Sequence, residues 1–328
     1  MEFMDMHCDS LSALLLTDPK EANLYQAKAT MVDFARMKQA GQLAQFFAVF
    51  LPFPGAFEKL GMPPMRDEAY IQTLCQWLRQ NVQQHSTLIG MAYNADDVLQ
   101  NRASGKMSAI LTMEDGRAVD GKLENLKRFY DMGFRGISLT WNMPNCFGFP
   151  NSTDPKIMGQ GLTDFGKEAV AYMQELGILV DVSHLSEGGF FDVAEICDKP
   201  FVATHSNSRG ELCPHPRGLT DEQIRVLAKA GGVTGLNYGP EFLNKDITCK
   251  DSTAALIAQH ARHIADVGGV ECLALGSDFD GIQGNLEIDD CTKVPLLEEA
   301  LREVGFTTGD IEKIFCKNLL RVMKDAMK

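Results

Sequence analysis

A histidine and an aspartate, both strong metal ligands, stand two residues apart near the start of the chain, in MHCDS. His7 and Asp9 end a short apolar run that is typical of a β-strand. Side chains at positions i and i+2 of a strand point to the same face, so both can bind one cation. A single His-x-Asp pair is common in sequences. It indicates a metal site only if other strands also end in metal-ligand residues.

Four more ligand-type side chains end other apolar runs: Glu114 in SAILTMED, His184 in GILVDVSH, His205 in PFVATHS and Asp278 in CLALGSDF. His184 and His205 come from successive strands and can hold a second cation, and Glu114 can bridge the two ions. Imidazole and carboxylate ligands suit zinc, with manganese or iron as alternatives. Two ions about 3.5–4 Å apart make a hydroxide nucleophile available and polarise a carbonyl, which is the chemistry of hydrolysis.

Each of these residues also has an ordinary structural interpretation. A single histidine after a buried strand is more often a hydrogen-bonded core or rim residue, and the aspartates of GSDFDG are typical turn formers. The metal-site interpretation depends on six ligand-type or acid/base side chains ending strands at one rim. Of the other histidines, we expect His85, His260 and His263 to be structural or solvated and His215 to be a loop residue.

The elements that must position these side chains follow from alternating apolar runs and helical periods. Eight apolar runs predict strands, at 2–9, 43–52, 108–115, 134–142, 177–184, 200–206, 231–238 and 272–279. Eight βα units favour a closed (β/α)₈ TIM-type barrel over an open doubly wound sheet, because no Gly-rich phosphate loop follows the first strand. In such barrels the chemistry occurs at the C-terminal ends of the strands, where the ligand-type residues fall.

Helices are predicted between the strands, for example at 68–85, 163–177, 220–231 and 252–268. Thr163, Thr220 and Ser252 are the expected N-caps of the last three. The stretch 294–327 predicts two amphipathic helices that close the barrel. No linker rich in Pro, Gly and Ser interrupts the sequence, so residues 1–328 are expected to form a single domain.

Composition excludes several classes of partner. The formal net charge of −13 argues against nucleic acid or an anionic membrane, because phosphate would repel the average surface. The nine cysteines are scattered without a Cys-x-x-Cys pair, which suits a reducing compartment. No apolar run approaches the length of a membrane span, and the N-terminus lacks the features of a signal peptide. These observations predict a cytoplasmic protein.

With these residues in place, the chain resembles the membrane (renal) dipeptidase family, zinc metallopeptidases with an amidohydrolase-like barrel. MHCD is similar to the family's His-x-Asp motif, TMEDG to its bridging glutamate, DVSH and ATHS to its two later histidine strands, CPHPRG to its arginine loop, and LGSDFDG to its most recognisable motif. The similarity extends over nearly the whole chain.

The resemblance implies two zinc ions as cofactors, one bound by His7 and Asp9 and one by His184 and His205. Glu114 would lie between them as a catalytic and metal-bridging residue.

For the substrate, the resemblance implies that Asp278 takes a proton from the bridging water and passes it to the leaving amine. Arg217 would bind the terminal carboxylate with its planar guanidinium, and Tyr238 would line the same pocket. The sequence departs from the family pattern after the fourth strand, where LTWN replaces a substrate-contacting histidine. Asn142, next to Trp141, is our candidate for oxyanion stabilisation.

The predicted function is therefore that of a binuclear zinc dipeptidase that cleaves free dipeptides, including those with a C-terminal D-residue, through a metal-bridging hydroxide. The partner is a small-molecule dipeptide, and the resemblance makes a homodimer the expected assembly. The alternatives are another amide or lactone hydrolase on the same barrel and a catalytically silent binding scaffold. A phosphate-binding barrel is disfavoured, because the loops after strands seven and eight show only a faint Gly-rich pattern.

Overall fold

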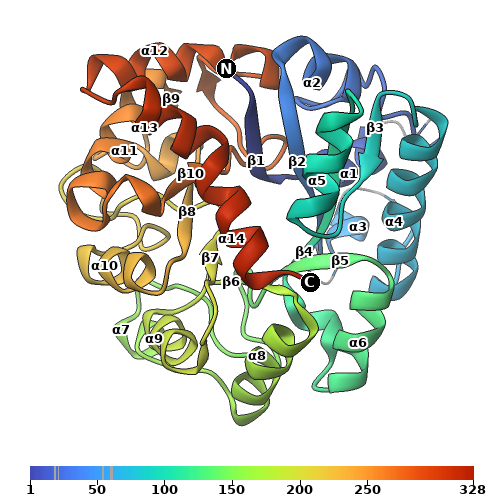
Figure 1. Ribbon diagram of the computed structural model, residues 1–328. Coiled ribbons are helices and arrows are strands. Elements are labelled where there is room, and N and C mark those ends of the chain that lie inside the picture. Colours follow the sequence, from blue (N-terminus) through green and yellow to red (C-terminus); the bar gives the residue numbers. More distant parts are fainter. Residues whose placement is uncertain (18–19, 21, 54, 60–61) are drawn as a thin grey trace.

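The computed structural model describes residues 1–328 except for 18, 19, 21, 54, 60 and 61. In the described residues, eight parallel strands form a ring with helices outside it (Figure 1). The strands of the ring are β1 (Phe3–Cys8), β2 (Gln42–Phe50), β4 (Met107–Glu114), β5 (Phe134–Ser138), β6 (Leu179–Asp181), β7 (Val202–Ala203), β8 (Val233–Leu236) and β10 (Leu273–Leu275). The ring closes because β2 pairs with both β1 and β4. The predicted (β/α)₈ barrel is confirmed.

Each of the eight predicted apolar runs overlaps a strand of the ring, with β2 and β4 beginning one residue earlier than predicted. The sequence interpretation missed β3 (Ile89–Met91), which pairs with β4 outside the ring. This strand has a glycine, Gly90, at its centre and only Ile89 is fully buried, so its apolar pattern is weak. The sequence interpretation also missed a small two-stranded parallel sheet, formed by β9 (Asp251–Ser252) and β11 (Asn285–Leu286).

The helices follow the expected alternation. Their bounds are α1 (Ser10–Thr17), α2 (Phe34–Ala40), α3 (Ala56–Lys59), α4 (Asp67–Gln84), α5 (Ala95–Ala103), α6 (Leu123–Asp131), α7 (Pro155–Met158), α8 (Asp164–Leu176), α9 (Glu187–Ile196), α10 (Asp221–Lys229), α11 (Ala254–Gly268), α12 (Pro295–Glu303), α13 (Thr308–Glu312) and α14 (Asn318–Ala326). Short 3₁₀ turns are η1 (Gly116–Val119), η2 (Pro240–Phe242), η3 (Val270–Cys272) and η4 (Cys291–Lys293), and a π-helical turn, η5 (Lys313–Lys317), joins α13 to α14.

Helix capping explains most of the predicted boundaries. The hydroxyl of Thr163 accepts a hydrogen bond from the backbone N–H of Gly166 and begins α8, and Thr220 begins α10 with a complete capping box. Helix α11 begins one residue later than predicted, because Thr253 and not Ser252 provides its cap.

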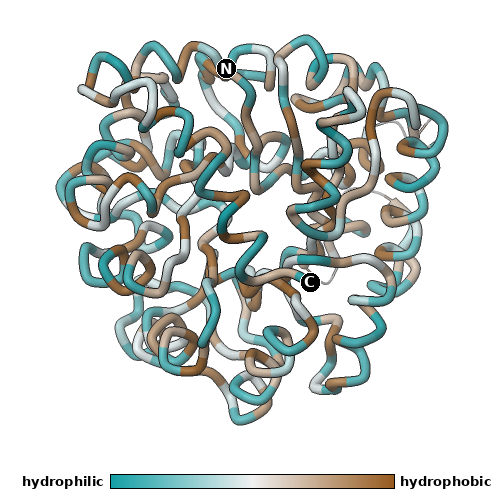
Figure 2. The backbone as a smooth tube through the Cα atoms, viewed as in Figure 1, coloured by the Kyte–Doolittle hydropathy of each residue, from teal (hydrophilic) through white to brown (hydrophobic). Residues whose placement is uncertain are grey.

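The N-terminal end of the barrel is closed by an apolar plug. Side chains from the starts of the strands, such as Met4 and Leu43, belong to one buried cluster with Leu319, Val322 and Met323 of α14. Helix α14 crosses the centre of the ring in Figure 1, and Figure 2 shows hydrophobic residues along the strands and hydrophilic residues at the periphery. The plug leaves the opposite end of the barrel for polar side chains. Among the described residues, no helix combines the length and apolar character needed to cross a bilayer.

Candidate active site

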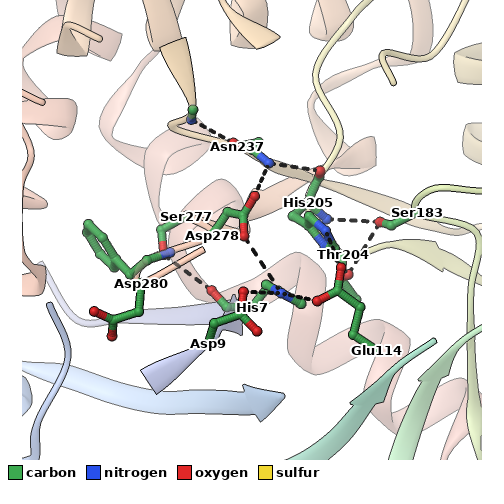
Figure 3. A network of polar contacts seen from close by, with 12 residues as sticks. His7, Asp9, Glu114, Ser183, Thr204, His205, Asn237, Ser277, Asp278 and Asp280 are labelled. Carbon is green, nitrogen blue, oxygen red and sulfur yellow. Dashed lines mark hydrogen bonds and ion pairs between the residues drawn. The ribbon is translucent and has the colours of Figure 1, made fainter. Parts of the chain in front are cut away.

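Six predicted side chains converge at the C-terminal end of the barrel. His7 lies in β1 and Glu114 ends β4, whereas Asp9, His184, His205 and Asp278 lie in the loops directly after β1, β6, β7 and β10. None of the six is more than 9% exposed. Figure 3 shows the carboxylates of Asp9, Glu114 and Asp278 close to the His7 ring, with His205 beside it. The sequence predicted that these side chains lie at one rim of the barrel, and in the fold they lie together there.

Two of these residues have left-handed backbone conformations. The φ angles of His184 and Asp278 are 66° and 64°. A non-glycine residue in this region costs on the order of 1–3 kcal/mol, and such conformations cluster at functional sites. The surrounding structure holds both turns: the His184 carbonyl accepts a hydrogen bond from the backbone N–H of Asn151 at 2.7 Å, and Asp278 donates its own N–H to the His7 carbonyl at 3.3 Å.

Glu114 divides its two carboxylate oxygens between two groups of ligands. Its Oε2 atom lies 3.3 Å from Nε2 of His7. Its Oε1 atom lies 2.9 Å from Nε2 of His184 and 3.6 Å from Nε2 of His205. Asp9 completes the first group, with Oδ2 3.5 Å from Nε2 of His7. This is the arrangement required of a carboxylate that bridges two cations.

The chemistry of the donors fits divalent cations. The Nε2 atoms of His184 and His205 face each other at 3.1 Å, and burial lowers the pKa of both rings, that of His184 to about 4. Two neutral imidazoles with converging Nε2 atoms are well placed to share a cation. Within the described part of the chain, Nε2 of His7 and Oδ1 of Asp9 are buried without hydrogen-bond partners. Potential ligand atoms form three overlapping groups in which all atoms lie within 4.8 Å of one another.

Asp278 has an environment suited to proton transfer. Burial, together with the neighbouring Asp9 and Glu114 carboxylates and against the opposing effect of His7, raises the pKa of its carboxyl to about 7. The side-chain amide of Asn237 donates to Oδ2 of Asp278 at 2.8 Å and fixes the orientation of the carboxyl group. A carboxyl group with a pKa near neutrality can both accept and release a proton under physiological conditions.

Arg217 lies buried beside the second group of ligands. Its guanidinium donates to Oγ of Ser206 at 2.6 Å and to the His205 carbonyl at 3.2 Å. Its Nε–H is buried and, among the described residues, has no partner. These two contacts orient the Arg217 guanidinium beside the imidazoles, and its remaining N–H groups are available to a ligand.

Asn142 is exposed at the mouth of the site. Its Oδ1 atom lies 3.2 Å from Nδ1 of His184, so the side chain of Asn142 contacts a candidate metal ligand directly. Trp141 packs edge to face against Phe50, with ring centroids 4.8 Å apart, and its ring centroid lies 6.3 Å from that of His184. The stretch LTWN thus supplies one polar and one aromatic side chain beside His184.

Tyr238 lies in the hydrophobic core, outside the cluster of imidazoles and carboxylates. Its ring packs edge to face against Phe279, with 5.5 Å between centroids. Its neighbour Asn237, and not Tyr238, contacts Asp278. The proposed contact of Tyr238 with substrate stays a prediction.

The remaining histidines lie outside the cluster. Buried His260 contacts Oγ of Ser208 through Nδ1 and the Leu243 carbonyl through Nε2. His263 contacts Asp221 at 2.7 Å on a half-exposed surface.

Sequence reasoning missed four buried polar residues that support the site, namely Asp5, Asp181, Thr204 and Asn237. Each contacts a neighbouring strand end: Asp5 accepts hydrogen bonds from the backbone N–H groups of His7 and Ser277, for example. A signal was present, because Asp5, Asp181 and Thr204 are polar residues inside apolar runs. Such runs do not reveal which partners the polar residues contact.

Comparison with known proteins agrees with the geometry. A family model described as "Membrane dipeptidase (Peptidase family M19)" matches residues 1–328. The chain belongs to this family. It is therefore a metallopeptidase of the dipeptidase type, and the resemblance predicted from the motifs is confirmed.

Solved and curated relatives extend this comparison. A metallopeptidase from Rhodobacter sphaeroides, solved with a phosphinate mimic of the dipeptide L-Ala-D-Ala, superposes with a TM-score of 0.89 at 30% identity and 99% coverage of both chains. An uncharacterised protein from the pqqA 5′ region of Klebsiella pneumoniae is 35% identical over 76% of this chain and 93% of its own length. A dipeptidase of Claviceps purpurea is 27% identical over 90% of this chain and 69% of its own length.

Proposed function

We propose that this metallopeptidase is a binuclear zinc dipeptidase that hydrolyses free dipeptides, including those with a C-terminal D-residue, in one domain formed by residues 1–328. The observation that carries the proposal is the placement of the Glu114 carboxylate, with one oxygen near His7 and the other near His184 and His205. The first ion would be held by His7, Asp9 and Glu114, and the second by Glu114, His184 and His205. Bound zinc would supply Lewis acidity to the substrate carbonyl and activate the attacking water.

Side chains of the protein carry out the remaining steps. Asp278 takes the proton of the attacking water and delivers it to the leaving amine, with its carboxyl group held by Asn237. Arg217 binds the carboxylate of the dipeptide through the N–H groups that Ser206 and His205 do not use. A carboxylate one residue beyond the scissile bond fits this donor, whereas cleavage at an internal bond of a longer chain would place an amide there.

Asn142 has one group free for the substrate. Its Oδ1 atom accepts from the Nδ1–H of His184, so its side-chain N–H₂ group remains to donate to the substrate carbonyl oxygen as negative charge develops there. Trp141 and Phe50 supply an apolar wall next to this donor. The proposed D-residue tolerance draws support from the similar Rhodobacter structure, which was solved with a mimic of L-Ala-D-Ala.

The proposal is tested by hydrolysis of four substrates by zinc-loaded protein: L-Ala-L-Ala, L-Ala-D-Ala, N-acetyl-L-Ala-D-Ala and L-Ala-L-Ala-L-Ala. We expect cleavage of both free dipeptides and much slower cleavage of the acetylated and tripeptide substrates. Zinc binding without cleavage of either dipeptide would refute the dipeptidase and favour another amide or a lactone as substrate. The homodimer and the cytoplasmic location expected from the sequence stay predictions.

A further inference from the structure

One nitrogen of the His205 ring faces the other metal-site residues, and the second faces a buried hydroxyl. Nε2 lies 3.1 Å from Nε2 of His184, whereas Nδ1 lies 2.8 Å from Oγ1 of Thr204. A neutral imidazole carries its proton on only one nitrogen, and only the other nitrogen has a lone pair for a cation. The partner of Nδ1 therefore decides whether Nε2 can act as a ligand.

The direction of the Thr204 hydroxyl is set by Asp181. Oδ2 of Asp181 lies 2.6 Å from Oγ1 of Thr204 and also accepts from the hydroxyl of Ser138. Oδ1 of Asp181 accepts from the backbone N–H groups of Ser183 and Thr204, both at 2.9 Å. The carboxylate acts only as an acceptor in all four contacts, so the single proton of the Thr204 hydroxyl points toward Asp181.

With its proton used, Oγ1 of Thr204 offers a lone pair to His205, and the hydrogen bond between them requires a proton on Nδ1. The peptide of His205 is fixed as well, because its N–H donates to Oγ of Ser183 at 3.2 Å. Asp181 and Thr204 are 2% and 5% exposed, so water competes little for these contacts. Figure 3 shows Thr204 and Ser183 next to the His205 ring.

We infer that Asp181 and Thr204 are positioning residues that hold His205 as the Nδ1–H tautomer and so direct the lone pair of Nε2 toward the second cation. The inference rests on the metal site of the proposed function but not on the identity of the substrate. Loss of such a supporting contact typically weakens metal binding 10- to 100-fold.

The test compares zinc binding to metal-free protein in three variants. Thr204→Val removes the hydroxyl at nearly constant volume, and Thr204→Ser retains it. The matched control is Thr112→Val: Thr112 is also buried in the barrel, and its Oγ1 atom has no hydrogen-bond partner among the described residues. By competition with a chelator, we expect about 10- to 100-fold weaker binding of one of two zinc ions in Thr204→Val, and near wild-type binding in the other two variants.

A second measurement determines the His205 tautomer directly in the wild-type protein. Nitrogen-15 NMR of the histidine side chains of metal-free protein at pH 8, with His205 assigned by its loss in His205→Gln, should show the proton on Nδ1. A proton on Nε2, or wild-type zinc affinity in folded Thr204→Val, would overturn the inference. Neither readout uses a dipeptide, so a protein that passes both tests yet cleaves no dipeptide would refute the proposed function alone.

Discussion

Replacing Arg217 with methionine tests how the protein recognises a dipeptide. Arg217 uses two of its five N–H groups on Ser206 and on the His205 carbonyl, which leaves three, the buried Nε–H included. Hydrogen bonds to a charged group contribute about 1.5–3 kcal/mol each. Two bonds to the substrate carboxylate at the lower limit give about 3 kcal/mol, which corresponds to about a 100-fold loss of kcat/KM for L-Ala-L-Ala.

The same substitution also removes the contacts to Ser206 and His205, so its effect on the substrate must be separated from damage to the site. The assay therefore measures kcat/KM of wild type and Arg217→Met with both L-Ala-L-Ala and L-Ala-L-Ala amide, which lacks the carboxylate. We expect the amide to be a poor substrate for the wild type and to lose less than about 3-fold further in the variant, because the lost interaction is absent from it. An equal loss for both substrates would refute a carboxylate contact and leave Arg217 a structural role.

Three further predictions follow from other contacts. Asp278→Asn removes proton transfer and should lower kcat about 10²- to 10⁴-fold; unchanged kcat at full zinc content would contradict this role. Asn142→Asp keeps an acceptor for His184 but loses the N–H₂ group, so kcat/KM should fall about 100-fold with little change in zinc affinity measured by competition. Wild-type kinetics in Asn142→Asp, or in Asn142→Ala, would remove Asn142 from catalysis. Burial lowers the pKa of His260 to about 4. Between pH 6.5 and 4, His260 is therefore protonated in the unfolded chain but still neutral in the folded protein. The unfolding free energy should therefore fall by about 3 kcal/mol more between pH 6.5 and 4 in the wild type than in His260→Gln. The same fall in both proteins, measured by urea unfolding, would disprove this prediction.

The barrel and the ligand-type residues could be predicted because both depend on local patterns. Apolar runs mark the eight strands, and parallel strands bring their C-terminal ends to one rim, so His7 and Asp278 meet although they are far apart in sequence. Strand β3 escaped prediction because Gly90 lies at its centre and only one of its three residues is fully buried, so its apolar pattern is weak. The start of α11 differed by one residue, since Ser252 and Thr253 are both suitable caps and only the backbone conformation distinguishes them.

The supporting contacts could not be predicted, because they join residues from different strands. Asp181 contacts Ser138 and Thr204, which lie 43 and 23 residues away. The sequence shows only that Asp181 is a polar residue in an apolar run. Similarly, the contact of Asn237 with Asp278 joins residues that lie 41 positions apart in the sequence.

The account depends most on two zinc ions acting together in this site. The direct measurement is the rate of L-Ala-D-Ala hydrolysis by metal-free protein as zinc is added, with bound zinc determined on the same samples. The account predicts activity that rises with bound zinc and saturates near two equivalents per chain. Failure of the protein to bind any divalent metal, or full binding of two zinc ions without hydrolysis, would contradict it.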